Sequence, residues 1–233
     1  MTRGFRATLL PALDLQSGIP NEYRTLVAIP AMLTSLDEIG ELIGRLEIHH
    51  LASPDGDLQF ALLSDWTDAK SEQIEGDAPL LTAALEGIAK LNQRYGSAPG
   101  GNRFLLLHRR RVWCASEDCW MGWERKRGKL SELNRYLRGA TDTTFIAPPT
   151  APLDVRFVIT LDADTRLPRG TVRRLIGKMA HPLNRPRIDP ILGRVVEGHA
   201  VLQPRVTPAL PVAREGSLFL RVFSSAAGID PYA

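Results

Sequence analysis

Short apolar runs alternate along the chain with longer segments in which apolar residues recur every three or four positions. Runs of this kind predict strands, and the run Thr25–Leu33, which has no polar face, is typical of a strand buried on both sides in a parallel sheet. These predicted strands are Thr25–Leu33, Leu58–Ser64, Arg103–His108 and Val155–Leu161. Amphipathic helices are predicted from Ser35, over Pro79–Tyr95, over Lys129–Arg138 and over Thr171–Met179. A last strand is predicted at Ala200–Val206.

Strands that alternate with helices predict an α/β fold, in which a mostly parallel sheet carries helices on both faces. Ligands of such sheets bind at the carboxyl ends of the strands, and each polar cluster of this chain falls at one of those ends. Ser35 and Glu38 have the spacing of a capping box, which marks the start of the first helix. Residues 1–23 are rich in turn signals, so we expect an irregular lead-in before one domain over residues 24–233.

Composition narrows the classes of function only modestly. The chain has 233 residues, 44% of them hydrophobic and 24% charged, as in ordinary soluble proteins. A net charge of +3 gives no reason to expect a nucleic-acid partner. The basic clusters Arg109–Arg111 and Arg125–Lys129 suit either a phosphate-bearing ligand or a solvated face. With no membrane-length apolar stretch and no signal peptide, the chain as written is expected to be cytoplasmic.

The sharpest chemical signal is the pair Asp162 and Asp164, which directly follows the apolar run FVITL. Two carboxylates at the end of a buried strand can reach one small volume, where they repel each other unless a cation lies between them. Oxygen ligands suit Mg²⁺ or Mn²⁺, which would bridge to a diphosphate. A solvated acidic turn, with one aspartate capping the next helix, explains the residues about equally well.

Two further polar clusters lie at the ends of predicted elements. Gly128 and Lys129 stand at the predicted start of a helix, where backbone N–H groups and nearby cations attract phosphate. They do not form a P-loop, because Leu130 stands where Ser or Thr is needed. Asp65 ends the second predicted strand and could accept hydrogen bonds from a base or ribose. Taken singly, these residues are explained better by a basic helix start and a turn residue than by a ligand site.

The order of these features is more specific than any one of them. It is the order found in processive GT-A glycosyltransferases: strand, Asp65, strand, Gly128-Lys129 with Leu133-Asn134, strand, Asp162-x-Asp164. Nearly the whole chain resembles the cyclic β-1,2-glucan synthases, the family 84 glycosyltransferases. The segments that carry this resemblance are RTLVAIPAMLTS, LQFALLSDWTDA, CWMGWERKRGKLSELNRYLRG and FVITLDADTRLPRGTVRRLIGKMAHPLNRP.

The resemblance implies a GT-A-like, Rossmann-like fold that is incomplete at its C-terminal side. It also implies a large synthase whose transferase domain lies on the cytoplasmic face of the bacterial inner membrane. UDP-glucose would be the donor, and a growing glucan the acceptor. On this basis Asp162 and Asp164 hold Mg²⁺ or Mn²⁺ on the UDP diphosphate. Asp65 contacts the uracil or ribose, and Gly128 and Lys129 lie along the nucleotide.

The catalytic base is expected outside this chain. Members of the family continue past Asp230-Pro231-Tyr232 into an acceptor-side segment, whose carboxylate acts as general base in an inverting transfer. We therefore expect the base beyond Ala233, in a synthase whose C-terminal and transmembrane regions are absent from this sequence. Donor binding is then expected of the chain alone, without turnover.

Two other functions compete with the transferase. Asp162-Ala163-Asp164-Thr165 also fits the D-x-D-x-T motif of haloacid-dehalogenase-type phosphatases, with Asp162 as nucleophile and Mg²⁺ as cofactor. Such enzymes need a downstream lysine and a further acidic pair, and the acidic residues after Thr165 form no pair. The other competing function is that of a non-catalytic remnant that binds UDP.

Overall fold

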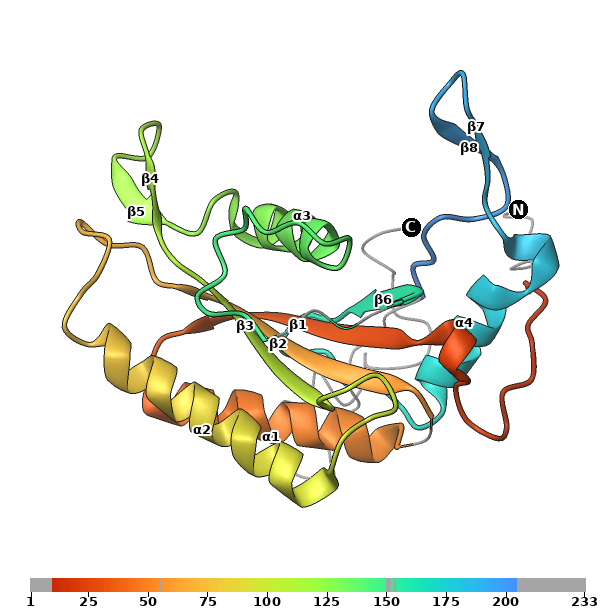
Figure 1. Ribbon diagram of the computed structural model, residues 1–233, viewed down its shortest axis with the longest axis horizontal. Helices are drawn as coiled ribbons and strands as arrows, with labels where there is room; N and C mark the ends of the chain where they lie inside the picture. The colour runs from red at the N-terminus through yellow and green to blue at the C-terminus, as the bar shows by residue number, and fades with distance from the viewer. Residues whose placement is uncertain (1–9, 55, 150–151, 153, 205–233) are drawn as a thin grey trace, which may run out of the picture. The chain divides into compact units, whose positions relative to one another are not determined.

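The structure is a computed structural model that describes residues 10–54, 56–149, 152 and 154–204 (Figure 1). The chain divides into two compact units, with the division after Leu183. Residues 10–24 are irregular apart from the single turn η1 (Asn21–Tyr23). Within the described residues, no helix is long and apolar enough to cross a membrane.

A four-stranded parallel sheet forms the centre of the first unit. Its strands are β1 (Thr25–Leu33), β2 (Leu58–Trp66), β3 (Phe104–Arg109) and β6 (Phe157–Thr160). They lie in the order β3-β2-β1-β6, so the chain builds β2 and β3 on one side of β1 and then places β6 on the other. A sheet of this kind opens a crevice at the carboxyl ends of its strands, where the strand order reverses.

Helices cover both faces of this sheet, as the alternating pattern predicts (Figure 1). Helices α1 (Leu36–Ala52) and α2 (Asp77–Tyr95) pack on one face together with α4 (Thr171–Ala180). Helix α3 (Arg125–Tyr136) packs on the other face. The predicted α/β fold with a parallel sheet is confirmed, and its strand order is consistent with a Rossmann-like GT-A fold.

Strand β1 shows why its sequence has no polar face. Val27 and Ile29 belong to the core that includes α1 and α2, whereas Leu26 and Ala28 belong to the core beneath α3. Successive side chains of a strand point to opposite faces, so a strand covered on both sides needs apolar residues at every position. The predicted helix start after β1 is also confirmed, since the Ser35 hydroxyl accepts a hydrogen bond from the Glu38 N–H at 3.2 Å.

Several predicted boundaries near the site are wrong. Strand β2 runs on to Trp66, so Asp65 lies within the strand. Helix α3 begins at Arg125, one turn before Lys129. The segment between β3 and α3, for which the sequence predicts no strand, contains a hairpin. Its strands are β4 (Val112–Cys114) and β5 (Cys119–Met121).

The described part of the second unit is a short hairpin that the sequence pattern does not predict. After the turn η2 (Pro182–Asn184), antiparallel strands β7 (Arg187–Asp189) and β8 (Arg194–Glu197) pair with each other. The strand predicted at Ala200–Val206 does not form over residues 200–204, and its last two residues lie outside the described residues. Since residues 205–233 lie outside them too, the extent of one domain over residues 24–233 stays a prediction.

Candidate functional site

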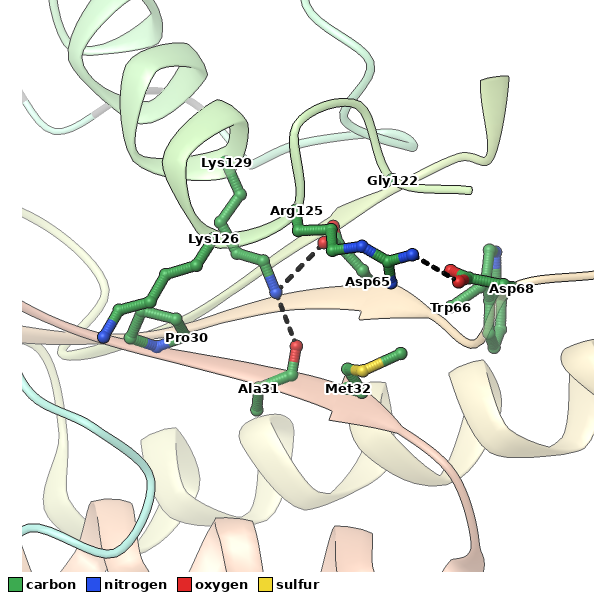
Figure 2. A pocket seen from close by; sticks show the side chains of 10 residues that line it. All are labelled: Pro30, Ala31, Met32, Asp65, Trp66, Asp68, Gly122, Arg125, Lys126 and Lys129. Carbon is green, nitrogen blue, oxygen red and sulfur yellow. Dashed lines mark hydrogen bonds and ion pairs between the residues drawn. The ribbon is translucent and has the colours of Figure 1, made fainter. Parts of the chain in front are cut away.

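A cleft of about 260 Å³ opens at the carboxyl ends of β1 and β2, beneath the first turns of α3 (Figure 2). Strands β1 and β2 contribute its floor, and α3 with the loop before it contributes the opposite wall. The charged residues that line the cleft are Asp65, Asp68, Arg125, Lys126 and Lys129. Three cations and two carboxylates suit a ligand that carries negative charge and also offers hydrogen-bond donors.

Asp65 is held at the floor of the cleft by two cations. It is only 5% exposed, and both of its oxygens accept hydrogen bonds from Arg109. The distances are 2.7 Å from Arg109 Nε to Oδ1 and 3.0 Å from Nη2 to Oδ2. Lys129 Nζ lies 3.1 Å from Oδ2. A two-point arginine contact fixes the plane of a carboxylate, so the orientation of Asp65 is set before any ligand binds.

Lys129 ties the ends of two strands together. Its side chain is 5% exposed, and Nζ donates to the carbonyl oxygen of Ala31 in β1 at 2.7 Å while also contacting Asp65 in β2 (Figure 2). Burial lowers the pKa of Lys129, and the Asp65 carboxylate opposes that shift. The structure therefore brings the predicted residues Asp65 and Lys129 into one cleft. Their contacts with a nucleotide stay predictions.

Gly128 has a different local role from the one that the sequence suggests. It lies inside α3, and its N–H donates to the carbonyl oxygen of Glu124 at 3.0 Å. The expectation of a free amide at a helix start is therefore wrong for this residue. A Cβ atom at Gly128 would lie 1.9 Å from the Trp123 carbonyl oxygen, so glycine lets the helix pack against the loop before it. Its place along the nucleotide stays a prediction.

Asp162 and Asp164 follow β6, the strand on the other side of β1 from Asp65. Both side chains are exposed, in a turn where the Thr165 N–H donates to the Asp162 carbonyl oxygen at 2.9 Å. The Asp162 carboxylate forms an ion pair with Lys126, which also lines the cleft. This ion pair links the predicted metal-binding turn to the cleft that holds Asp65.

The carboxylates of Asp162 and Asp164 offer the oxygen donors that a divalent cation prefers. A cation, the Lys126 ammonium, already contacts one of them. Mg²⁺ is often held by only one or two protein carboxylates, with waters and substrate phosphates as its other ligands. Two carboxylates on an exposed turn beside a cleft match that donor set. The metal itself stays a prediction.

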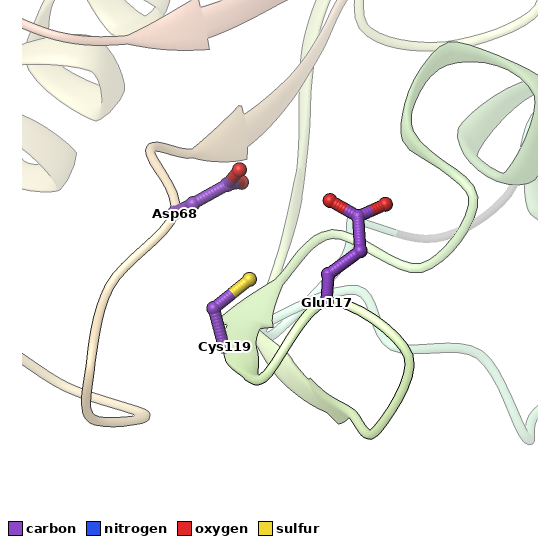
Figure 3. A group of neighbouring side chains, drawn as sticks. All are labelled: Asp68, Glu117 and Cys119. Atoms are coloured by element: carbon purple, nitrogen blue, oxygen red, sulfur yellow. The ribbon is translucent and has the colours of Figure 1, made fainter.

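A second group of acidic side chains lies near the β4–β5 hairpin (Figure 3). Ligand atoms of Asp68, Glu117 and Cys119 lie within 4.8 Å of one another, the one such group of three in the described ranges. Arg125 Nη2 contacts both carboxylates, at 2.9 Å from Asp68 and 2.8 Å from Glu117. Partial burial and these carboxylates raise the pKa of the Cys119 thiol. An arginine counter-ion and a protonated thiol explain this group without a metal.

Arg109 and Glu132 are site residues that the sequence interpretation missed. Both are buried, and Arg109 Nη1 donates to Glu132 Oε1 at 3.1 Å. Glu132 also accepts a hydrogen bond from the Thr144 N–H at 2.8 Å. The expectation of a solvated or phosphate-binding cluster is therefore wrong for Arg109. Alternation along β3 could have revealed this, because Arg109 shares a face with the buried residues Leu105 and Leu107.

His108 gives this region a predicted pH dependence. Burial lowers its pKa from 6.5 to about 4, and its Nδ1 lies 2.9 Å from Ser64 Oγ. The unfolded chain therefore binds a proton at a higher pH than the folded chain does, so stability is full above about pH 6.5 and falls as the pH drops toward 4. We expect the free energy of unfolding to fall by about 2–3 kcal/mol between about pH 7 and 4.5 from this residue.

Urea unfolding at both pH values, with wild type and His108→Asn, measures this contribution. The variant should be less stable at neutral pH because it leaves a cavity, but its stability should fall less on acidification. Equal losses in the two proteins would assign the pH dependence to other groups, such as His49 and His50, whose pKa values burial also lowers.

A curated relative aligns with nearly the whole chain. Over 224 residues, which are 96% of its length, the chain is 49% identical to the cyclic β-(1,2)-glucan synthase NdvB of Rhizobium meliloti. The resemblance to the cyclic β-1,2-glucan synthases is confirmed. The chain spans only 8% of the length of that synthase. Protein-family profiles gave no match.

Proposed function

We propose that this chain is the donor-binding part of a glycosyltransferase, which uses UDP-glucose in β-1,2-glucan synthesis. The observation that carries the proposal is the cleft at the carboxyl edge of the sheet. It gathers Asp65 and Lys129, and Lys126 links it to Asp162. Similarity to a glucan synthase over 96% of the chain supports the reaction class and favours a transferase over a phosphatase.

Asp65 is suited to recognise one hydrogen-bond donor of the nucleoside. An ionised carboxylate can accept about four hydrogen bonds. Arg109 supplies two and Lys129 contributes a third contact, which leaves room for about one more. A uracil N–H or a ribose hydroxyl would fill that place. Because Arg109 fixes the carboxylate, the contact needs no rearrangement when the donor binds.

The diphosphate would lie toward the cations at the start of α3. Arg125 and Lys126 lie in the first turn of α3 and line the cleft. Asp162 and Asp164 would hold Mg²⁺ or Mn²⁺, whose chemistry is to stabilise the charge that develops on UDP as it leaves. Transfer also needs a general base for the attacking hydroxyl. We expect that carboxylate in the acceptor-side segment of the synthase, with the growing glucan as acceptor on the cytoplasmic side of the membrane.

Calorimetric titration with UDP, in Mg²⁺ and then in EDTA, tests the proposal. We expect UDP to bind at least about tenfold more tightly in Mg²⁺ than in EDTA. A single contact between charged groups can contribute about a tenfold gain in affinity, and the metal would add at least one such contact to the diphosphate. UDP-glucose should compete with UDP for the site. We expect no Mg²⁺-dependent release of phosphate from an aryl phosphate, which is the activity of a phosphatase. Absence of UDP binding, or phosphatase activity in its place, would overturn the proposal.

A further inference from the structure

We propose that Lys126 is an exchangeable counter-ion of the donor site. It neutralises Asp162 while the site is empty, and it transfers to the donor diphosphate when a divalent cation takes its place at Asp162. The inference rests on the proposed function and gives Lys126 a specific role, exchange between Asp162 and the diphosphate, that neither the motifs nor the resemblance assigns. Its consequence is that the site disfavours the bare metal and favours the metal together with a nucleoside diphosphate.

The position of Lys126 gives it access to both partners. It lies in the first turn of α3 and lines the cleft, and its Nζ contacts Oδ1 of Asp162, 36 residues further along the chain. In Figure 2 its side chain extends past Pro30, whereas that of Lys129 turns toward Asp65. Lys126 is therefore the cleft-lining cation that contacts the predicted metal-binding turn.

The two lysines differ in how firmly the fold holds them. Lys129 is almost fully buried and contacts both Asp65 and the Ala31 carbonyl oxygen. The side chains of Lys126 and Asp162 are 54% and 61% exposed. Exposed ion pairs contribute little to stability, so this one can open at low cost. A lysine ammonium on a flexible stem, with three donors, can turn to a phosphate oxygen once it is released.

Lys126 and the metal ion compete for the Asp162 carboxylate, and this competition decides which binding steps Lys126 weakens and which it strengthens. A metal ion that binds without a donor must displace the Lys126 ammonium and leave that positive charge nearby without its partner. When a diphosphate binds with the metal, its negative oxygens become the new partner of the ammonium. Lys126 thus couples the two ligands: it weakens the binding of metal alone and strengthens the binding of UDP to the metal-loaded site.

Lys126→Met and Arg127→Met form a matched pair of variants. Arg127 is the next residue of α3, its side chain is 79% exposed, and it pairs with Glu124 rather than lining the cleft. Its replacement therefore removes the same charge from the same helix turn. Mn²⁺ binding alone is measured from the spin-resonance signal of the free ion. UDP binding at saturating Mn²⁺ is measured by calorimetry.

We expect Lys126→Met to bind Mn²⁺ about threefold more tightly and UDP about tenfold more weakly than wild type, as for the loss of one charged hydrogen bond. Arg127→Met should change each affinity by less than about twofold, and Lys126→Arg should restore UDP binding. The inference is overturned if Lys126→Met changes the Mn²⁺ and UDP affinities in the same direction, or if it changes neither. It is also overturned if Arg127→Met changes them as much as Lys126→Met does. A wild-type chain without Mn²⁺-dependent UDP binding would instead overturn the proposed function.

Discussion

Replacing Arg109 by methionine is expected to lower the free energy of unfolding by about 3–5 kcal/mol. Arg109 is fully buried, and its guanidinium contacts the buried carboxylates of Asp65 and Glu132. Methionine fills much of the same space but removes the arginine from both negative charges. Among the described residues, Asp65 then keeps only Lys129 as a cationic partner, and the buried Glu132 keeps no cation. Breaking such a pair from one side costs more than the intact pair contributes. Urea denaturation at neutral pH measures the difference.

Arg110→Met is the matched control for this prediction. Arg110 is the next residue along the chain, and its side chain is largely exposed. Its Nη1 atom lies 3.7 Å from Oε1 of Glu72. Its replacement should change stability by no more than about 0.5 kcal/mol. Similar losses in the two variants would mean that the buried charges around Asp65 do not depend on Arg109.

Replacing Asp164 by alanine is expected to remove the metal-dependent part of UDP affinity while leaving the fold intact. Asp164 lies on an exposed turn, so the substitution disturbs no core packing. The loss should be at least about tenfold in Mg²⁺, because even groups that only orient metal ligands cost about tenfold or more when removed. In EDTA the variant and the wild type should bind UDP equally weakly. Calorimetry under both conditions provides the comparison.

Glu117→Gln controls for the other acidic group. Glu117 lies with Asp68 and Cys119 near the β4–β5 hairpin, where Arg125 contacts its carboxylate. Its substitution should leave the metal dependence of UDP binding unchanged. Should Glu117→Gln abolish that dependence while Asp164→Ala keeps it, the metal would belong to this group and not to the turn after β6.

Most of the sheet was predictable from the sequence because β1, β2 and β3 are buried almost completely on both faces. Their apolar character needs no information about distant partners, as the match between the run TLVAIPAML and β1 shows. The start of α3 was not predictable in this way. Its first turn, Arg125–Gly128, carries no apolar residue, so the helical spacing begins to show only at Leu130. Arg125 and Lys126 in that turn form ion pairs with Asp68 and Asp162, which are far from the turn in sequence.

The candidate site was predictable in part for the same reason. Asp65 was found because a polar residue that ends an apolar run marks the ligand-binding edge of a parallel sheet. Arg109 was missed because a charged residue beside two other arginines suggests a solvated face. In the interior its charge is neutralised by ion pairs with Asp65 in β2 and Glu132 in α3, and neither partner is close to it in sequence. Tertiary pairing of this kind leaves only a weak local signal, the alternation along β3.

Diffraction from crystals grown with UDP and Mn²⁺, recorded at the manganese absorption edge, locates the metal directly. We expect an anomalous peak within about 2.5 Å of carboxylate oxygens of Asp162 and Asp164, bridging to the diphosphate. The uracil or ribose should then lie against Asp65. A manganese peak among Asp68, Glu117 and Cys119, or UDP bound in the cleft with no metal at the turn after β6, would contradict the proposed donor site.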